Sequence, residues 1–269
     1  MSPATMRARP AIPLALLAAL GGAFAVAQLA FAAPAEEPTR AIAPVSAAGP
    51  RPVSVMPGVA ATASRPRNAP AEHGIVELHG SVALSDRPGG PATQTLGPTT
   101  EFGSPQALSV AARRGGWLGV VTSERPNGSL GWVRKASASL RLRSTRWSLH
   151  ADLSARTLTL RRNGRRVHRL SVAIGAPGSE TPTGRFAVTD KLSGSQFGPY
   201  YGCCILALSG HQPKTPAGWR GGSRLAIHGT DAPSTIGTAA SAGCLRASDG
   251  DLQTLMNKVA LGTPVLVRA

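Results

Sequence analysis

The chain has 269 residues and a formal net charge of +16, which is carried almost wholly by arginine. The basic residues are dispersed and form no run as dense as a nucleic-acid-binding arm, so DNA and RNA are poor candidates for partners. A basic protein outside the membrane meets anionic wall polymers or lipid headgroups instead.

The N-terminus has the pattern of an export signal. Two arginines precede an apolar run over residues 12–30, and Ala30-Phe31-Ala32 has the small-x-small pattern that signal peptidase cleaves. We predict a signal peptide over residues 1–32 and a protein exported to the periplasm or cell wall. The apolar run is also long enough to stay uncleaved as a membrane anchor, so an N-terminal tether is the alternative.

Residues 33–73 are rich in alanine and proline and have neither helical nor strand periodicity. Such a segment cannot bury enough apolar surface to fold. We predict a disordered linker here.

Short alternating runs separated by turns follow over residues 74–143. Trp117-Leu118-Gly119-Val120-Val121 and Leu130-Gly131-Trp132-Val133 are the clearest, and Arg125-Pro126-Asn127-Gly128 separates them. This pattern predicts a small all-β barrel. The tryptophan-bearing strands resemble those of bacterial SH3-like domains, which implies binding to wall glycopeptide. The alternative is that both tryptophans are only core aromatics.

A second unit is predicted from residue 147 to residue 269. Thr157-Leu158-Thr159-Leu160 alternates, Asn163-Gly164 gives a tight hairpin turn, and residues 167–174 return as the partner strand. Residues 224–228 alternate again, so His228 is expected to end a strand.

One helix is predicted near the C-terminus. Ser248 can cap it and Asp251 completes the capping box. Four apolar residues then recur at helical spacing, namely Leu252, Leu255, Met256 and Val259. Gly262 closes the segment, and residues 264–267 are expected to form a final strand.

Three cysteines are an odd number for an oxidising compartment. A bond between the neighbours Cys203 and Cys204 would close a strained ring, so we expect two separate, buried, apolar residues in a strand. Cys244 is then the thiol left for chemistry. It shares a glycine-punctuated segment with His228, and a thiol with a histidine base is the pairing that nucleophilic catalysis requires.

Three stretches together resemble the catalytic domain of the YkuD-like L,D-transpeptidases over residues 147–269. They are residues 152–160, residues 172–186, and the block from His228-Gly229-Thr230 to Ser241-Ala242-Gly243-Cys244-Leu245-Arg246. The resemblance implies a mainly β chain: an L,D-transpeptidase-type β-sandwich with one short helix near the C-terminus, preceded by the small SH3-like barrel.

The resemblance also implies roles for individual residues. Cys244 is expected to be the nucleophile and His228 the general base and acid, with the Gly229 carbonyl orienting its ring. The N–H groups of Gly243 and Cys244 are expected to stabilise an oxyanion. Four residues are expected to contact substrate, namely Arg246, Ser241, Thr230 and Tyr201. The Arg246 guanidinium is expected to bind a substrate carboxylate.

Each of these residues also has a structural reading. Ser241 and Thr230 could satisfy backbone groups of their loops, and Tyr201 could be a buried strand aromatic. Many family members have a second histidine where this chain has Ala242. The thiol–imidazole pair survives that departure, but any contribution of the second ring to donor preference is lost.

The reaction that the resemblance implies acts on peptidoglycan stem peptides and needs no cofactor and no metal. Cys244 attacks the carbonyl between diaminopimelate and the terminal D-Ala of a tetrapeptide donor. The side-chain amine of a second diaminopimelate then resolves the thioester into a cross-link, which ties the protein to wall biogenesis and cell shape. Acylation of the same cysteine by carbapenems is implied as well.

Three alternatives stay open at this point. Resolution by water would make the protein an L,D-carboxypeptidase of the same fold, and loss of turnover would leave a wall-binding protein. A zinc site could use Cys203, Cys204, Cys244, His211 and His228, but these residues lack the short paired spacing of zinc ligands. We otherwise expect His211 to be a plain loop histidine.

Overall fold

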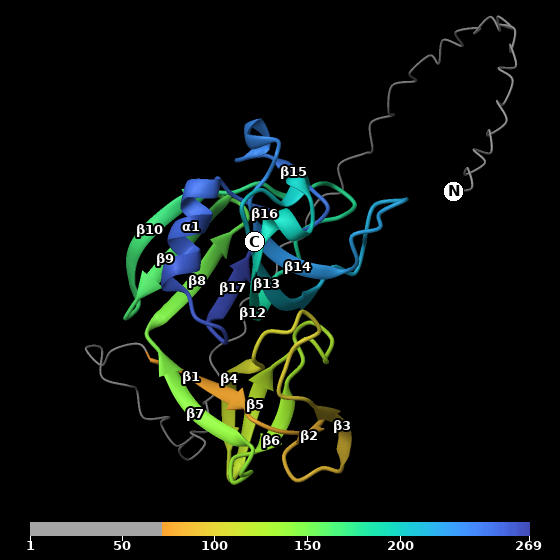
Figure 1. The fold of residues 1–269 in the computed structure, drawn as a ribbon, viewed down its shortest axis with the longest axis vertical. Coiled ribbons are helices and arrows are strands. Elements are labelled where there is room, and N and C mark those ends of the chain that lie inside the picture. The colour runs from red at the N-terminus through yellow and green to blue at the C-terminus, as the bar shows by residue number, and fades with distance from the viewer. Residues whose placement is uncertain (1–71) are drawn as a thin grey trace, which may run out of the picture. The chain divides into compact units, whose positions relative to one another are not determined.

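A computed structural model describes residues 72–269, and these residues are mainly β with one α-helix (Figure 1). The predicted signal peptide, and the predicted linker up to residue 71, lie outside this part of the chain. His73, expected to end the linker, instead begins the first strand. Within residues 72–269 no helix is long and apolar enough to cross a membrane.

The N-terminal sheet has seven strands in the order β3-β2-β6-β5-β4-β1-β7. Its core contains Val76, Leu84, Leu108, Leu118 and Val133, all at most 1% exposed. Trp117 and Trp132 are half-buried and lie outside that core. The strands are β1 (His73–Leu78), β2 (Val82–Ser85), β3 (Ala92–Leu96), β4 (Ala107–Arg114), β5 (Trp117–Val121), β6 (Gly131–Arg134) and β7 (Leu140–Thr145).

The C-terminal sheet has eight strands in the order β10-β9-β8-β17-β12-β13-β14-β16. Two neighbouring pairs are parallel, β8 with β17 and β14 with β16. The strands are β8 (Trp147–Asp152), β9 (Thr157–Arg162), β10 (Arg165–Ser171), β12 (Gly184–Ser193), β13 (Cys204–His211), β14 (Arg224–His228), β16 (Leu245–Arg246) and β17 (Pro264–Arg268). A separate parallel pair joins β11 (Ile174–Gly175) to β15 (Ala239–Ser241).

The hairpin between β9 and β10 follows the sequence signal. Asn163 and Gly164 have φ values of 52° and 77°, the left-handed conformation that this two-residue turn demands. The return strand was expected to run to residue 174, but it ends at Ser171. It ends there because the next two residues bond elsewhere: the Val172 N–H donates to the Arg156 carbonyl, and Ala173 pairs with Arg246.

The helix α1 (Asp249–Lys258) packs on the C-terminal sheet (Figure 1). The Ser248 hydroxyl caps it by accepting from the Asp251 N–H at 3.2 Å. Leu252 and Leu255 are fully buried in one core with Leu206 and Ile227 of the sheet. Burying each such leucine contributes about 1.5–3 kcal/mol, so α1 holds β13 and β14 in place.

Cys203 and Cys204 form a disulfide bond with each other, so the prediction of two separate apolar residues was wrong. That prediction placed both residues in one strand, where neighbouring side chains point to opposite faces. In the structure β13 begins at Cys204. Cys203 therefore lies outside the pleated strand, and its side chain is free of that alternation.

Candidate active site

The pairing of β14 with β16 brings the His228 and Cys244 segments together. His228 is the last residue of β14 and is paired with Arg246 of β16, and Ile227 is paired with Leu245. Cys244 directly precedes β16. The Ala247 N–H donates to the His228 carbonyl at 2.9 Å and extends this pairing.

The His228 ring has a defined tautomer. Its Nδ1 lies 2.6 Å from the Gly229 carbonyl, and a carbonyl can only accept, so Nδ1 carries the hydrogen. Nε2 is then unprotonated, and it is buried without a hydrogen-bond partner among residues 72–269. Burial lowers the pKa of His228 from 6.5 to about 4, against the opposing effect of the Gly229 bond. The ring is therefore neutral at neutral pH, with a free lone pair on Nε2.

The buried, neutral His228 predicts a pH dependence of stability. Above pH 6.5 the ring is neutral in both the folded and the unfolded chain. As the pH falls from about 6.5 to about 4 the unfolded chain takes up the proton first, which costs the folded state on the order of 3 kcal/mol. We expect wild-type protein to lose this stability and His228→Asn to keep it in urea unfolding at pH 7, 5.5 and 4.5. Parallel pH profiles for the two proteins would contradict the assignment.

Cys244 is a free, half-buried thiol. Its Sγ lies 3.9 Å from the Arg224 carbonyl, to which the S–H donates. Burial raises the pKa of Cys244 to about 11, and the Ala226 N–H and Arg246 oppose that rise. Thiol and imidazole are therefore both neutral at neutral pH.

The turn of residues 241–244, which carries the thiol, is fixed by hydrogen bonds of its own. The Ser241 hydroxyl donates to the Cys244 carbonyl at 2.6 Å and accepts from the Gly243 N–H at 3.1 Å. Gly243 has a φ of 121°, and a Cβ there would lie 2.0 Å from Nε2 of Gln212. Ser241 is 2% exposed, and both of these hydroxyl bonds organise the turn. The Gly243 N–H can bind an oxyanion only by exchanging its present partner.

Two further residues position this turn, and sequence reasoning missed both. Nε2 of Gln212 lies within 3.2 Å of the carbonyls of Ser179, Glu180 and Ala242. The Thr181 hydroxyl donates to the Gly243 carbonyl at 2.8 Å. Thr181 stands in a segment that carried the family resemblance, whereas Gln212 follows a loop histidine without any periodic or motif signal.

Arg246 is a buried cation beside the histidine. Its guanidinium lies over the Tyr200 ring at 4.6 Å and donates to the Tyr200 hydroxyl. Its Nε is buried without a hydrogen-bond partner, and no carboxylate in the described part of the chain forms an ion pair with it. An unpaired, buried guanidinium can bind an incoming carboxylate.

The remaining candidates lie around the same histidine. Tyr200 and Tyr201 belong to the short helix η2 (Pro199–Tyr201), and the Tyr201 ring centroid is 4.9 Å from that of His228. Burial, and next the nearby Cys244, raise the pKa of Tyr201. Thr230 lines an open cavity of about 530 Å³ with Pro199 and Gly202, and its hydroxyl accepts from the Ala232 N–H. The structure therefore places Tyr201 beside the ring and Thr230 at the cavity.

The zinc alternative loses its ligands in this arrangement. The sulfurs of Cys203 and Cys204 are bonded to each other. His211 is fully engaged, with Nδ1 3.0 Å from the Ser223 hydroxyl and Nε2 donating to the Ser123 carbonyl. Over residues 72–269 no group of three His, Cys, Asp or Glu side chains could hold a metal ion.

The disulfide predicts a simple cysteine count. Protein purified without reductant and alkylated under denaturing conditions should gain one modification, at Cys244, because the other two sulfurs are bonded. Reduction before alkylation should raise the number to three. Intact-mass and peptide mass spectrometry measure both numbers. Three modifications without reduction would contradict the bond.

Comparison with known proteins places this site in a family. Residues 146–267 match the YkuD model, described as the L,D-transpeptidase catalytic domain. The chain is 32% identical over 123 residues to the Bacillus subtilis protein named "Putative L,D-transpeptidase YkuD", a match covering 45% of this chain and 65% of that protein. It is 33% identical over 106 residues to "Putative L,D-transpeptidase YqjB" of the same organism, covering 36% and 57%. The chain thus spans less than two thirds of the length of these relatives.

Among solved structures, an L,D-transpeptidase from Mycobacterium smegmatis is similar with a TM-score of 0.36 and 20% identity, over 54% of this chain and 76% of that one. The family match and the curated relatives cover the same part of the chain. Residues 146–267 of this chain are an L,D-transpeptidase catalytic domain of the YkuD family.

Proposed function

We propose that this protein is a peptidoglycan L,D-transpeptidase that works through a Cys244 thioester. The observation that carries the proposal is the tautomer of His228. The Gly229 carbonyl holds the hydrogen on Nδ1 and leaves Nε2 as a buried, unpartnered base next to the turn that presents Cys244. A family match over residues 146–267 supports the same assignment.

In the first half-reaction the thiol turns from the Arg224 carbonyl towards His228 and loses its proton to Nε2. Sγ then attacks the carbonyl that joins diaminopimelate to the terminal D-Ala of a donor tetrapeptide. The imidazolium returns the proton to the leaving D-Ala nitrogen as the C–N bond breaks. The products are a thioester on Cys244 and free D-Ala.

In the second half-reaction the side-chain amine of a second diaminopimelate attacks the thioester. Nε2 takes a proton from that amine and returns it to Sγ, so an amide bond forms while the C–S bond breaks. Water in place of the amine would give a tripeptide and a carboxypeptidase. Exclusion of water from the site therefore decides whether the amine or water resolves the thioester.

Arg246 and the turn supply the charge stabilisation in this scheme. The Nε–H of Arg246 is an unused donor for a carboxylate of the stem peptide. The Cys244 N–H has no acceptor within the described residues and is available to stabilise the oxyanion, with the Gly243 N–H joining once it releases Ser241.

The experiment is mass spectrometry of the products after purified protein is incubated with a disaccharide tetrapeptide. A dimer that has lost one D-Ala supports transpeptidation. A tripeptide alone would replace the proposal by an L,D-carboxypeptidase. No product at all would leave a wall-binding protein.

The proposal extends to location and inhibition. Export by residues 1–32, with or without a retained anchor, would deliver the enzyme to the wall, and the N-terminal sheet would bind glycopeptide as its SH3-like pattern implies. Acylation of Cys244 by a carbapenem follows from the same thioester chemistry.

A further inference from the structure

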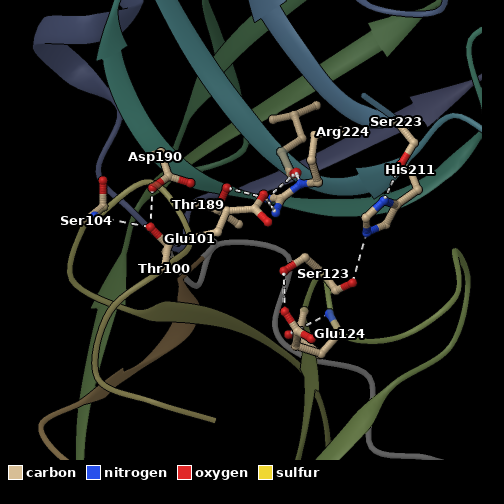
Figure 2. Close-up of polar contacts among 12 residues, drawn as sticks. Thr100, Glu101, Ser104, Ser123, Glu124, Thr189, Asp190, His211, Ser223 and Arg224 are labelled. Atoms are coloured by element: carbon tan, nitrogen blue, oxygen red, sulfur yellow. Dashed lines mark hydrogen bonds and ion pairs between the residues drawn. The ribbon is translucent and has the colours of Figure 1, made fainter. Parts of the chain in front are cut away.

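The loop between β3 and β4, residues 97–106, lies against the C-terminal sheet (Figure 2). Residues 72–269 form one compact unit, and this loop makes specific contacts within it. The Thr100 hydroxyl donates to the carboxylate of Asp190, which is fully buried in β12. Glu101 forms an ion pair with Arg224, the first residue of β14, at 2.5 Å.

All three nitrogens of the Arg224 guanidinium form hydrogen bonds. Nε and Nη2 donate to the Leu208 carbonyl at 3.0 and 2.8 Å, Nη2 also donates to the Thr189 hydroxyl, and Nη1 binds Glu101. The guanidinium also lies over the Phe102 ring at 5.8 Å. Two residues of the loop, Glu101 and Phe102, thus contact the Arg224 guanidinium directly.

The same Arg224 touches the candidate nucleophile. Its carbonyl is the group that accepts from Cys244 Sγ. Glu101, in the loop between two strands of the N-terminal sheet, therefore binds the side chain of the residue whose carbonyl contacts the Cys244 sulfur.

A second set of contacts leads from the loop to His228. The Phe102 ring packs edge-on against Phe197 at 6.2 Å, and Phe197 packs against Tyr201 at 6.1 Å. Tyr201 packs against the His228 ring at 4.9 Å. Phe102 and Phe197 are 37% and 43% exposed, so this row of aromatic rings lies at the surface of the site.

A third set of contacts leads to the turn before Cys244. The side chain of Asn127, in the loop after β5, donates to the His211 carbonyl at 2.6 Å and accepts from the His211 N–H at 2.9 Å. The Ser123 carbonyl binds the His211 ring, as Figure 2 shows. The next residue, Gln212, binds the Ala242 carbonyl.

We infer that the N-terminal sheet is a working part of the active site, in which Glu101 and Phe102 are positioning residues. Glu101 acts on Cys244 through Arg224, and Phe102 acts on His228 through Phe197 and Tyr201. This inference rests on the proposed function, because it assigns the two loop residues to the same thiol and imidazole.

The expected effect follows from the geometry. The Arg224 carbonyl accepts from the protonated thiol, so it favours the thiol over the thiolate and fixes its rotamer. Glu101 is 54% exposed, and exposed ion pairs contribute little to stability, so its removal should leave the fold intact. Loss of Glu101 should instead loosen Arg224, which lowers the pKa of Cys244 and misplaces its sulfur.

The test uses the full chain with two variants, Glu101→Gln and Phe102→Ala. Matched controls are Glu77→Gln, whose partner Arg143 lies in the N-terminal sheet, and Leu142→Ala, another exposed apolar residue of that sheet. We expect each test variant to lower kcat about tenfold with KM nearly unchanged, and both controls to match wild type. In Glu101→Gln the pH midpoint of Cys244 alkylation by iodoacetamide should shift downwards.

The other groups that act on the pKa of Cys244 are the Ala226 N–H, Arg246 and Tyr201, and all three are intact in every variant. Test variants that match their controls in kcat and in alkylation would overturn the inference. A loss confined to KM, or one that only follows a lower Tm with an unchanged midpoint, would also overturn it. If wild-type protein shows no turnover, the proposed function fails, while the alkylation profile still tests the coupling.

Discussion

Replacing Cys244 with alanine should abolish formation of every product from a tetrapeptide donor. The free thiol is the nucleophile in the proposed mechanism, and removing a nucleophile costs on the order of 10⁴-fold or more in rate. The two remaining cysteines are bonded to each other and cannot replace it. Mass spectrometry of dimer, tripeptide and free D-Ala over time measures the loss.

The alanine variant should stay folded, because the thiol is only half-buried and its contacts with the Arg224 carbonyl and the Ala226 N–H are weak sulfur hydrogen bonds. Thermal unfolding and circular dichroism provide this control. The acyl-enzyme gives a second readout: wild-type protein incubated with a carbapenem should gain the mass of one inhibitor, and Cys244→Ala should gain none. Product formation by the alanine variant at the wild-type rate would exclude Cys244 as the nucleophile.

Replacing His228 with asparagine should lower kcat by about 10²- to 10⁴-fold, the usual contribution of a general acid–base residue. The hydrogen fixed on Nδ1 leaves the lone pair of Nε2 free, and in the proposed mechanism this nitrogen takes the proton of Cys244. Asparagine can still donate to the Gly229 carbonyl, but it cannot accept a proton at neutral pH. Steady-state kinetics with the same donor measure the change.

His168→Asn is the matched control for this variant. His168 is part-exposed and binds Asp251 on α1, away from the turn that carries Cys244. Its replacement should leave kcat near the wild-type value. Equal losses in the two histidine variants would mean that His228 is needed for structure and has no specific part in proton transfer.

The Cys244→Ala and His228→Asn variants each retain one member of the thiol–imidazole pair. Cys244→Ala retains a buried imidazole, so its stability should fall below pH 6.5 as that of wild type does. His228→Asn retains the thiol and should still be alkylated at Cys244 at high pH. The pair of variants therefore separates the loss of the nucleophile from the loss of its base.

Local signals in the sequence determined much of the catalytic domain. The Asn163-Gly164 turn, the alternating strand that ends at His228, and the helix capped by Ser248 all lie where the sequence predicts them. Each of these depends on neighbours within a few residues, through backbone conformation, side-chain alternation or a capping bond. The Cys244 and His228 motifs likewise indicated the family that the match over residues 146–267 shows.

Only the tertiary structure decided which distant groups surround that pair. The contacts of Gln212 and Thr181 with the turn before Cys244 join segments about 30 to 60 residues apart. The ion pair of Glu101 with Arg224 crosses 123 positions of the chain. No periodic or short-range pattern encodes such contacts, because they form only when the packing of both sheets has fixed which loops meet.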